Sequence, residues 1–118
     1  MTKISIYHNP ECSKSRAALA LLEENDISPE IIYYLEMPPS IEDLKSLLEK
    51  LGLQLHDIIR SDEDDYDELG FDDETLSEEI VLDLLQKHPH LLQRPIVVKG
   101  GKAIIARPPE AVLGLIGE

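Results

Sequence analysis

Cysteine and long apolar runs are both scarce in this chain. Cys12 is the only cysteine among 118 residues, which excludes a disulfide within the chain. No segment approaches the ~18 apolar residues that a membrane-spanning helix needs, so we expect no membrane partner. The N-terminal residues lack the basic region and long apolar stretch of a signal peptide. We therefore expect a cytoplasmic protein that keeps its thiol reduced.

Aromatic residues are also few. The chain has four tyrosines, one phenylalanine and no tryptophan, whereas leucine and isoleucine are abundant. We therefore expect an aliphatic core. A length of 118 residues suits one core, so residues 1–118 are expected to form a single domain.

Positive charge is the third scarce property. The chain has 24 acidic and 11 basic residues and a formal net charge of −13, which disfavours nucleic acid as a partner. Residues 61–86 contain no lysine, arginine or histidine, and acidic residues crowd into 61–79. We interpret this acidic segment, residues 61–79, as a solvated face; a docking surface for a basic partner is the alternative. The arginines are Arg16, Arg60, Arg94 and Arg107.

The first third of the sequence predicts a strand, a helix and a second strand. Residues 3–8 alternate as in a strand, Asn9 and Pro10 turn the chain, and residues 13–24 have a helical apolar face. Residues 31–35 are β-rich and are expected to form a buried strand. This order predicts a βαβ unit with parallel strands and a right-handed crossover.

The middle of the sequence predicts helices. Ser40 and Asp43 resemble a capping box for a helix that Gly52 ends. A short helix is expected at about 54–60, and another begins after Thr75 or Ser77 and ends before residue 89. Residues of about 40–92 are therefore expected to form a helical insertion between two parts of a sheet.

The last third predicts a β-hairpin around Gly100 and Gly101. The fold class expected from all these elements is α/β, with a mixed four-stranded sheet built from the βαβ unit and a C-terminal ββα unit. Counting outward from the turn gives the pairs Lys99 with Lys102, Val98 with Ala103, Ile96 with Ile105, and Arg94 with Arg107.

Paired residues share one face of a sheet, so Arg94 and Arg107 are expected to project from the same side. Two guanidinium groups placed in this way suit a tetrahedral oxyanion. Surface arginines in water, or an arginine bound to an acidic residue, are the alternative.

Cys12 is the candidate nucleophile because it stands where a strand becomes a helix. The unpaired N–H groups and the positive dipole end of a helix N-terminus favour a thiolate. His8, Lys14 and Arg16 are sources of positive charge, and the Ser13 and Ser15 hydroxyls are possible donors to the sulfur. A small buried hydrophobic cysteine is the alternative.

No Cys/His cluster has the spacing of metal ligands. The other histidines, His56, His88 and His90, are scattered, and we interpret them as surface or helix-end residues. No metal and no bound organic cofactor are expected.

Several motifs occur together in a family-specific order. They are His8-Asn9-Pro10-Glu11-Cys12-Ser13-Lys14-Ser15-Arg16, Tyr34-Leu35-Glu36-Met37-Pro38-Pro39, Ile58-Ile59-Arg60, Tyr66-Asp67-Glu68-Leu69-Gly70 and Arg94-Pro95-Ile96-Val97-Val98. With these motifs the chain resembles the glutaredoxin-linked arsenate reductase family over nearly its whole length. The resemblance implies a thioredoxin-like fold.

The resemblance also implies site residues. The family's nucleophilic cysteine falls on Cys12, and its oxyanion-binding arginines fall on Arg60, Arg94 and Arg107. His8 and Ser15 take the roles of lowering the pKa of the thiol and hydrogen-bonding its sulfur, with Arg16 beside them. Pro95 matches the proline that thioredoxin-like folds hold in the cis form.

The reaction implied by the resemblance is reduction of arsenate to arsenite. The Cys12 thiolate attacks arsenic to give a covalent adduct. Because this chain has no second cysteine, an external thiol must resolve the adduct. In the family that thiol is glutathione, and glutaredoxin reduces the resulting mixed disulfide.

Three other functions are alternatives. Phosphatase-like arsenate reductases have a longer loop between cysteine and arginine, whereas three residues separate Cys12 from Arg16. Redox-sensing relatives that bind RNA polymerase commonly carry Cys-x-x-Cys, where this chain has Ser15. A thioredoxin-fold protein that acts on another oxyanion, or on mixed disulfides with glutathione, remains an open alternative.

Overall fold

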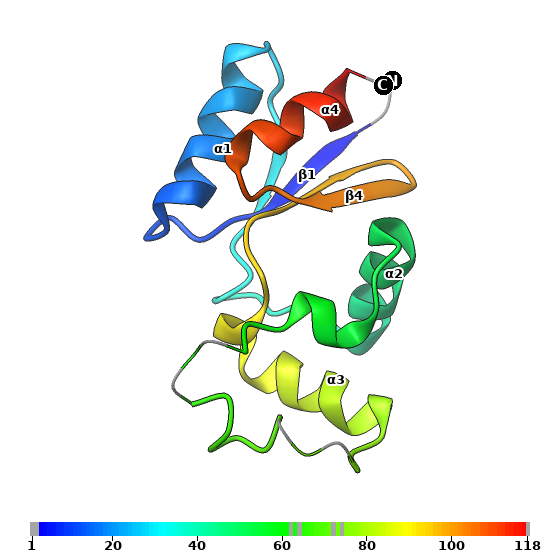
Figure 1. The fold of residues 1–118 in the computed structure, drawn as a ribbon. Coiled ribbons are helices and arrows are strands. Elements are labelled where there is room, and N and C mark those ends of the chain that lie inside the picture. Colours follow the sequence, from blue (N-terminus) through cyan, green and yellow to red (C-terminus); the bar gives the residue numbers. More distant parts are fainter. Residues whose placement is uncertain (1–2, 62, 64, 72, 74, 118) are drawn as a thin grey trace. The chain divides into compact units, whose positions relative to one another are not determined.

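The computed structural model describes residues 3–61, 63, 65–71, 73 and 75–117. The chain divides into two compact units (Figure 1), one formed by residues 1–37 and 94–118 and the other by residues 38–93. The second unit corresponds to the helical insertion expected at about 40–92. That the two units form a single domain stays a prediction.

The first unit contains a four-stranded sheet in the order β2-β1-β3-β4. Its strands are β1 (Ile4–Tyr7), β2 (Glu30–Ile32), β3 (Ile96–Lys99) and β4 (Lys102–Ile105). β1 is parallel to β2, and β3 is antiparallel to both β1 and β4. Helix α1 (Ser13–Glu24) connects the two parallel strands. The βαβ unit and the mixed α/β sheet are therefore confirmed.

The second strand is shorter than the sequence predicts. The prediction of a strand over 31–35 is wrong for its second half, because β2 ends at Ile32. After it, the Tyr33 carbonyl accepts hydrogen bonds from the N–H groups of Glu36 and Met37, at 3.0 and 2.9 Å, so the chain turns. Tyr34 is nevertheless fully buried, which explains why this stretch has the composition of a strand.

The hairpin has the predicted register from Ile96 opposite Ile105 to Lys99 opposite Lys102. Gly100 adopts a φ of 60°, which a residue without a side chain tolerates in a tight turn. Beyond the ladder the Ala106 N–H donates to the Pro95 carbonyl at 2.8 Å, which keeps the two segments adjacent.

One face of the sheet is covered by α1 and by α4 (Val112–Ile116), which follows η3 (Pro109–Ala111). Figure 1 shows the two helices side by side. Ile6 and Val97 are cross-strand partners and so share a face, and they pack against both helices. The cluster comprises Ile6, Ala18, Leu22, Val97, Ala106, Val112 and Leu115. This cluster is aliphatic, as the sequence predicts, although Tyr34 of the same unit is also fully buried.

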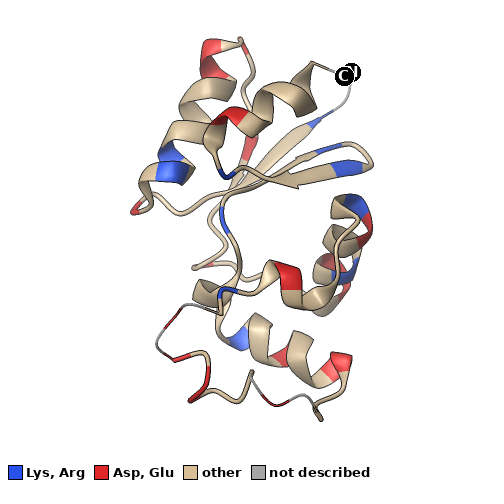
Figure 2. Ribbon diagram, viewed as in Figure 1, with Lys and Arg blue, Asp and Glu red and all other residues tan. Residues whose placement is uncertain are grey.

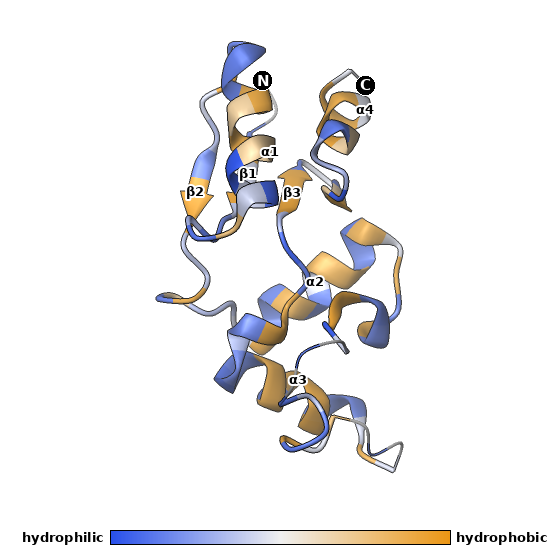
Figure 3. Ribbon diagram, turned by 60° about the vertical axis from the view of Figure 1, so that its left-hand side comes forward, coloured by the Kyte–Doolittle hydropathy of each residue, from blue (hydrophilic) through white to orange (hydrophobic). Residues whose placement is uncertain are grey.

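The second unit contains α2 (Ile41–Leu51), η1 (Leu55–Ile58), α3 (Glu78–Lys87) and η2 (Pro89–Leu91). Both longer helices alternate between hydrophobic and hydrophilic positions (Figure 3), as helices with one buried face do. Their buried side chains include Leu44, Leu47, Leu82 and Leu85.

The helix ends in the second unit follow from local side-chain chemistry. The capping box of Ser40 and Asp43 is present, and Gly52 ends α2 with a φ of 68°. α3 is capped by Ser77, whose hydroxyl accepts from the Ile80 N–H at 3.3 Å. The short helix predicted at 54–60 is a 3-10 turn of four residues.

The acidic segment, residues 61–79, follows η1 and ends in the first turn of α3, and Figure 2 shows acidic residues along it. Residues 62, 64, 72 and 74 of this segment lie outside the described residues. Within it, Tyr66 and Phe71 stack with ring centroids 5.7 Å apart, and Phe71 is buried. Across the described parts of the chain, no helix is long and apolar enough to cross a membrane.

Candidate active site

Cys12 is the N-cap residue of α1 and has the extended backbone, φ −95° and ψ 122°, that precedes a helix. Its N–H donates to the Asn9 carbonyl and its carbonyl accepts from the Arg16 N–H, both at 3.0 Å. The turn over residues 9–12 therefore delivers the thiol to the first turn of α1. Cys12 is a free cysteine of intermediate exposure.

The environment of Cys12 favours its thiolate. Burial acts to raise the pKa of the thiol, but the backbone N–H groups of Ser15 and Lys14 and the guanidinium of Arg94 outweigh it, so the pKa is lowered. Among the described residues, the thiol makes no capping hydrogen bond of ordinary geometry. The backbone N–H groups of Ser15 and Lys14 and the Arg94 guanidinium therefore stabilise the thiolate form of Cys12.

Arg94 supplies the positive charge beside the sulfur. It lies just before β3, so the fold of the first unit brings it to Cys12 from the far end of the sequence. Its Nε and Nη1 atoms are buried and, within the described chain, have no hydrogen-bond partner. Buried donors without acceptors are costly. These two atoms are therefore well suited to a ligand with several oxygen atoms.

Ser15 and His8 form a buried pair under the cysteine turn. Ser15 is fully buried, and its Oγ lies 2.6 Å from His8 Nδ1 and accepts from the Asn9 N–H at 3.0 Å. The hydroxyl is thus engaged with His8 and Asn9, and it is the backbone N–H of Ser15 that faces the sulfur. Burial, together with the charge of Arg16, lowers the pKa of His8 and favours its neutral ring.

Arg16 stabilises the turn that carries the cysteine. Its side chain is exposed, and Nη1 donates to the Pro10 carbonyl at 2.8 Å. Its charge acts on His8, because it is one cause of the lowered pKa of that ring. The structure thus places Arg16 near His8, while the charge that acts on the sulfur comes from Arg94.

Pro95 directly precedes β3, and Arg107 lies two residues after the end of β4. The Arg94–Pro95 peptide bond is cis, as is the Arg107–Pro108 bond, and Pro95 is buried. Arg107 follows β4 and is exposed, and its N–H turns back to the Ile105 carbonyl at 2.9 Å. Both arginines lie outside the β3–β4 ladder, so a shared face for them stays a prediction.

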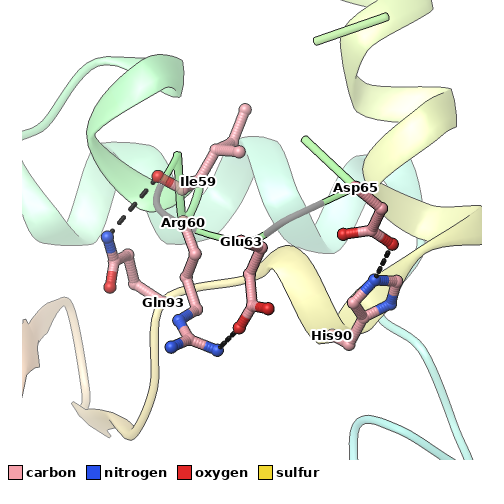
Figure 4. Close-up of polar contacts among 6 residues, drawn as sticks. All are labelled: Ile59, Arg60, Glu63, Asp65, His90 and Gln93. Atoms are coloured by element: carbon pink, nitrogen blue, oxygen red, sulfur yellow. Dashed lines mark hydrogen bonds and ion pairs between the residues drawn. The ribbon is translucent and has the colours of Figure 1, made fainter. Parts of the chain in front are cut away.

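Arg60 belongs to the second unit. Its backbone N–H donates to the Leu91 carbonyl at 2.7 Å, and its Nη1 donates to the carboxylate of Glu63 (Figure 4). The Arg60 side chain is 13% exposed, and its Nε has no partner among the residues that the structure describes. The structure brings Cys12, Ser15, His8 and Arg94 together in one unit, whereas a shared site with Arg60 stays a prediction.

The remaining histidines differ in their surroundings. His56 is exposed, and its Nε2 lies 3.2 Å from Asp57 Oδ1. His88 is the C-terminal cap of α3. His90 Nε2 lies 2.6 Å from Asp65 Oδ2, which ties the acidic segment to η2. Over the described ranges, no group of three or more His, Cys, Asp or Glu side chains is placed to hold a metal ion.

Comparison with known proteins identifies the family. A model of the ArsC family matches residues 7–115. The chain belongs to the ArsC family. It is 49% identical over 119 residues to uncharacterized protein YfgD of Escherichia coli (strain K12), a match that covers 99% of this chain and all of that protein. It is 47% identical over 113 residues to an arsenate reductase of Neisseria meningitidis serogroup B, covering 95% and 97% of the two chains.

A solved structure of an ArsC-type protein has the same fold. The arsenate reductase from Vibrio cholerae superposes with a TM-score of 0.92 at 47% identity, covering 96% of this chain and 97% of that one. This similarity confirms the α/β, thioredoxin-like fold predicted for the chain.

The ArsC fold also uses residues that sequence reasoning did not single out. The backbone N–H of Lys14 acts on the sulfur of Cys12, although only the charge of its side chain was considered. The backbone of Asn9 anchors the Ser15 hydroxyl. Glu63 binds Arg60 in a stretch that is not helical, so the spacing rule for side-chain pairs on helices does not predict this pair.

Proposed function

We propose that this protein is an arsenate reductase that uses Cys12 as its nucleophile. The observation that carries the proposal is the pairing of a stabilised thiolate with the partly unsatisfied guanidinium of Arg94. A nucleophile and oxyanion donors at one point suit attack on a tetrahedral oxyanion. Family membership and relatives named arsenate reductases favour arsenate as that oxyanion.

Binding of arsenate is assigned to three arginines. Arg94 stands beside the sulfur with two buried donors unused among the described residues. Arg107 and Arg60 join it in our proposal, on the strength of the family resemblance and of their guanidinium forks, which match paired oxyanion oxygens. Arg60 Nε is another buried donor without an acceptor in the described chain, which supports this role.

The first chemical step forms a bond between sulfur and arsenic. The Cys12 thiolate attacks As(V) of protonated arsenate, an As–OH bond breaks, and the departing hydroxyl group takes a proton from the solvent and leaves as water. The backbone N–H groups of Ser15 and Lys14 hold the thiolate in place before attack. Arg94 then stabilises the oxygens that gather charge in the transition state.

The second step transfers two electrons to arsenic. The thiolate of glutathione attacks the sulfur of Cys12, an S–S bond forms, and the electron pair of the S–As bond stays with arsenic. Arsenic leaves as As(III), in arsenite. A glutaredoxin thiol then reduces the mixed disulfide and regenerates the Cys12 thiolate. The single cysteine supports this external route, and the need for glutathione favours a cytoplasmic location.

His8, Ser15, Arg16 and Pro95 are proposed as positioning residues. His8 and the Ser15 hydroxyl fix the start of α1, so that the N–H of Ser15 points at the sulfur. Arg16 holds the Pro10 carbonyl and thereby the cysteine turn. Pro95 lies between Arg94 and β3 and fixes the backbone from which Arg94 projects.

The test is a coupled assay of arsenate-dependent NADPH oxidation with glutathione, glutaredoxin and glutathione reductase. Wild type is expected to turn over, and the Cys12→Ser variant is expected to be inactive. Arg94→Gln is expected to raise KM and lower kcat, because the guanidinium serves both substrate and transition state. Turnover that persists in Cys12→Ser would refute the nucleophile. Absence of turnover with a reactive Cys12 would refute arsenate as the substrate and favour another oxyanion or glutathione mixed disulfides.

A further inference from the structure

We infer that Glu63 competes with the substrate oxyanion for Arg60 and thereby lowers the affinity for that oxyanion. The inference rests on the proposed role of Arg60 in binding that oxyanion. The Glu63 carboxylate accepts a hydrogen bond from Arg60 Nη1 (Figure 4). A carboxylate and a tetrahedral oxyanion offer similar oxygen pairs to a guanidinium fork, so they compete for the same donor.

The Arg60–Glu63 pair is shielded from water more than the other ion pairs among the described residues. The side chains of Arg60 and Glu63 are 13% and 31% exposed, whereas those of Lys3 and Glu30 are 71% and 51% exposed. Exposed pairs are weakened by solvent and salt, and shielded pairs much less so. An oxyanion that binds Nη1 in place of Glu63 must therefore break an ion pair that solvent and salt weaken little.

Glu63 satisfies only part of the Arg60 guanidinium. Arg60 Nε is buried and donates to no acceptor among the residues that the structure describes. A buried donor of this kind gains from an acceptor that reaches it. Nε and Nη2 form one edge of the guanidinium, and Nη1 and Nη2 form another. An oxyanion that binds the Nη1–Nη2 edge must displace the Glu63 carboxylate, and one that binds the Nε–Nη2 edge lies beside its charge, so Glu63 weakens binding at both edges.

The backbone keeps Glu63 close to Arg60. The Glu63 N–H donates to the Arg60 carbonyl at 3.3 Å, and the Arg60 N–H is anchored on Leu91 at 2.7 Å. Two residues later, Asp65 is bound to His90, and Gln93 donates to the Ile59 carbonyl at 3.4 Å (Figure 4). Glu63 therefore occupies Arg60 whenever no oxyanion is bound, which lowers the apparent affinity for the oxyanion.

The Glu63→Gln variant tests this competition because it removes the charge and keeps the shape of the side chain. We expect KM for arsenate to fall roughly tenfold with kcat little changed, since a hydrogen bond to a charged group contributes on that scale. Glu68→Gln is the matched control: it removes the same charge from an exposed residue of the same segment. We expect Glu68→Gln to leave KM within about twofold of wild type.

Sulfate provides a second measurement that needs no turnover. Isothermal titration of wild type, Glu63→Gln and Glu68→Gln with sulfate should show tighter binding in Glu63→Gln only. In an Arg60→Gln background, the gain from Glu63→Gln should vanish, because no guanidinium remains to be released. Circular dichroism and urea unfolding of each variant establish that it is folded.

The outcomes separate this inference from the proposed function. Tighter sulfate binding in Glu63→Gln without arsenate turnover in any variant would support the competition and refute the reductase activity. Arsenate turnover with the same KM in wild type and Glu63→Gln would refute the competition and leave the reductase activity intact. A higher KM or a lower kcat in Glu63→Gln would also refute it, because Glu63 would then be orienting Arg60 for the substrate. An equal gain in Glu68→Gln would mean that general charge, and no specific contact, sets the affinity.

Discussion

Replacing Ser15 by alanine tests whether this residue acts on Cys12 through its hydroxyl or through its backbone N–H. The Ser15 side chain is fully buried, and its oxygen is bonded to His8 Nδ1 at 2.6 Å and to the Asn9 N–H at 3.0 Å. Ser15→Ala removes both hydrogen bonds and leaves His8 Nδ1 and the Asn9 N–H without this partner. Its backbone N–H, which faces the sulfur, remains.

The expected cost of Ser15→Ala follows from these contacts. Each partner left without a hydrogen bond costs about 1–3 kcal/mol, and the better helix propensity of alanine offsets roughly 0.5 kcal/mol. We expect the free energy of unfolding to fall by about 2–5 kcal/mol, which corresponds to a melting temperature lower by roughly 8–20 °C. Ser13→Ala, the same change at an exposed position of the same helix turn, should cost less than about 0.5 kcal/mol.

Two assays are needed for this prediction. Urea denaturation with an unchanged m-value measures the loss of stability. Rates of Cys12 alkylation over a range of pH measure the pKa of the thiol, which we expect to stay below its usual value in Ser15→Ala. An ordinary thiol pKa in a variant that is as stable as wild type would refute the reasoning, because the hydroxyl would then act directly on the sulfur.

Three further outcomes are expected from the same structure. Burial and Arg16 lower the pKa of His8 in the folded chain, so the unfolded chain takes up the proton first and wild type should lose stability as the pH falls below 6.5. A His8→Asn variant should show less of this acid-dependent loss in urea titrations; an equal loss would contradict the assignment. The lowered pKa of Cys12 stabilises the folded chain above the usual thiol value of 9.0, and this contribution disappears as the pH falls through the folded pKa. The stability difference between wild type and Cys12→Ala should therefore grow with pH, and a constant difference would count against a stabilised thiolate. Leu22→Ala, in the fully buried core, should cost about 2–5 kcal/mol, whereas Leu113→Ala, 44% exposed, should cost under about 1 kcal/mol. Equal losses would mean that the core is wrongly assigned.

The parts of the fold that depend on local chemistry could be predicted from the sequence. The register of the hairpin follows from Gly100 and Gly101, because a two-residue turn fixes every later pair. The start of α2 follows from Ser40 and Asp43, whose side chains bond the free N–H groups of the helix.

The end of β2 could not be predicted, because a buried turn and a paired strand can contain the same types of residue. Tyr33 and Tyr34 suit a strand, yet the hydrogen bonds of the Tyr33 carbonyl turn the chain. Tertiary burial of Tyr34, a property absent from local patterns, produced the false signal.

The candidate site was predictable to different degrees. The position of Cys12 at a helix N-terminus follows from the order of strand and helix, and it is present in the structure. The source of positive charge was less predictable: His8 is a sequence neighbour but is neutral once buried, while Arg94 comes from a distant segment. Sequence proximity identifies neighbours along the chain, and only the packed sheet identifies neighbours of the sulfur.

The most direct test of the proposed reductase chemistry is mass spectrometry of the intact protein and of its Cys12 peptide after mixing with arsenate and glutathione. Glutaredoxin is left out, so that the last reduction cannot occur. We expect a covalent arsenic or glutathione adduct on Cys12 that forms only when arsenate is present, and its loss, with release of arsenite, once glutaredoxin is added. Arsenite formed while Cys12 remains a free, alkylatable thiol throughout would contradict the account.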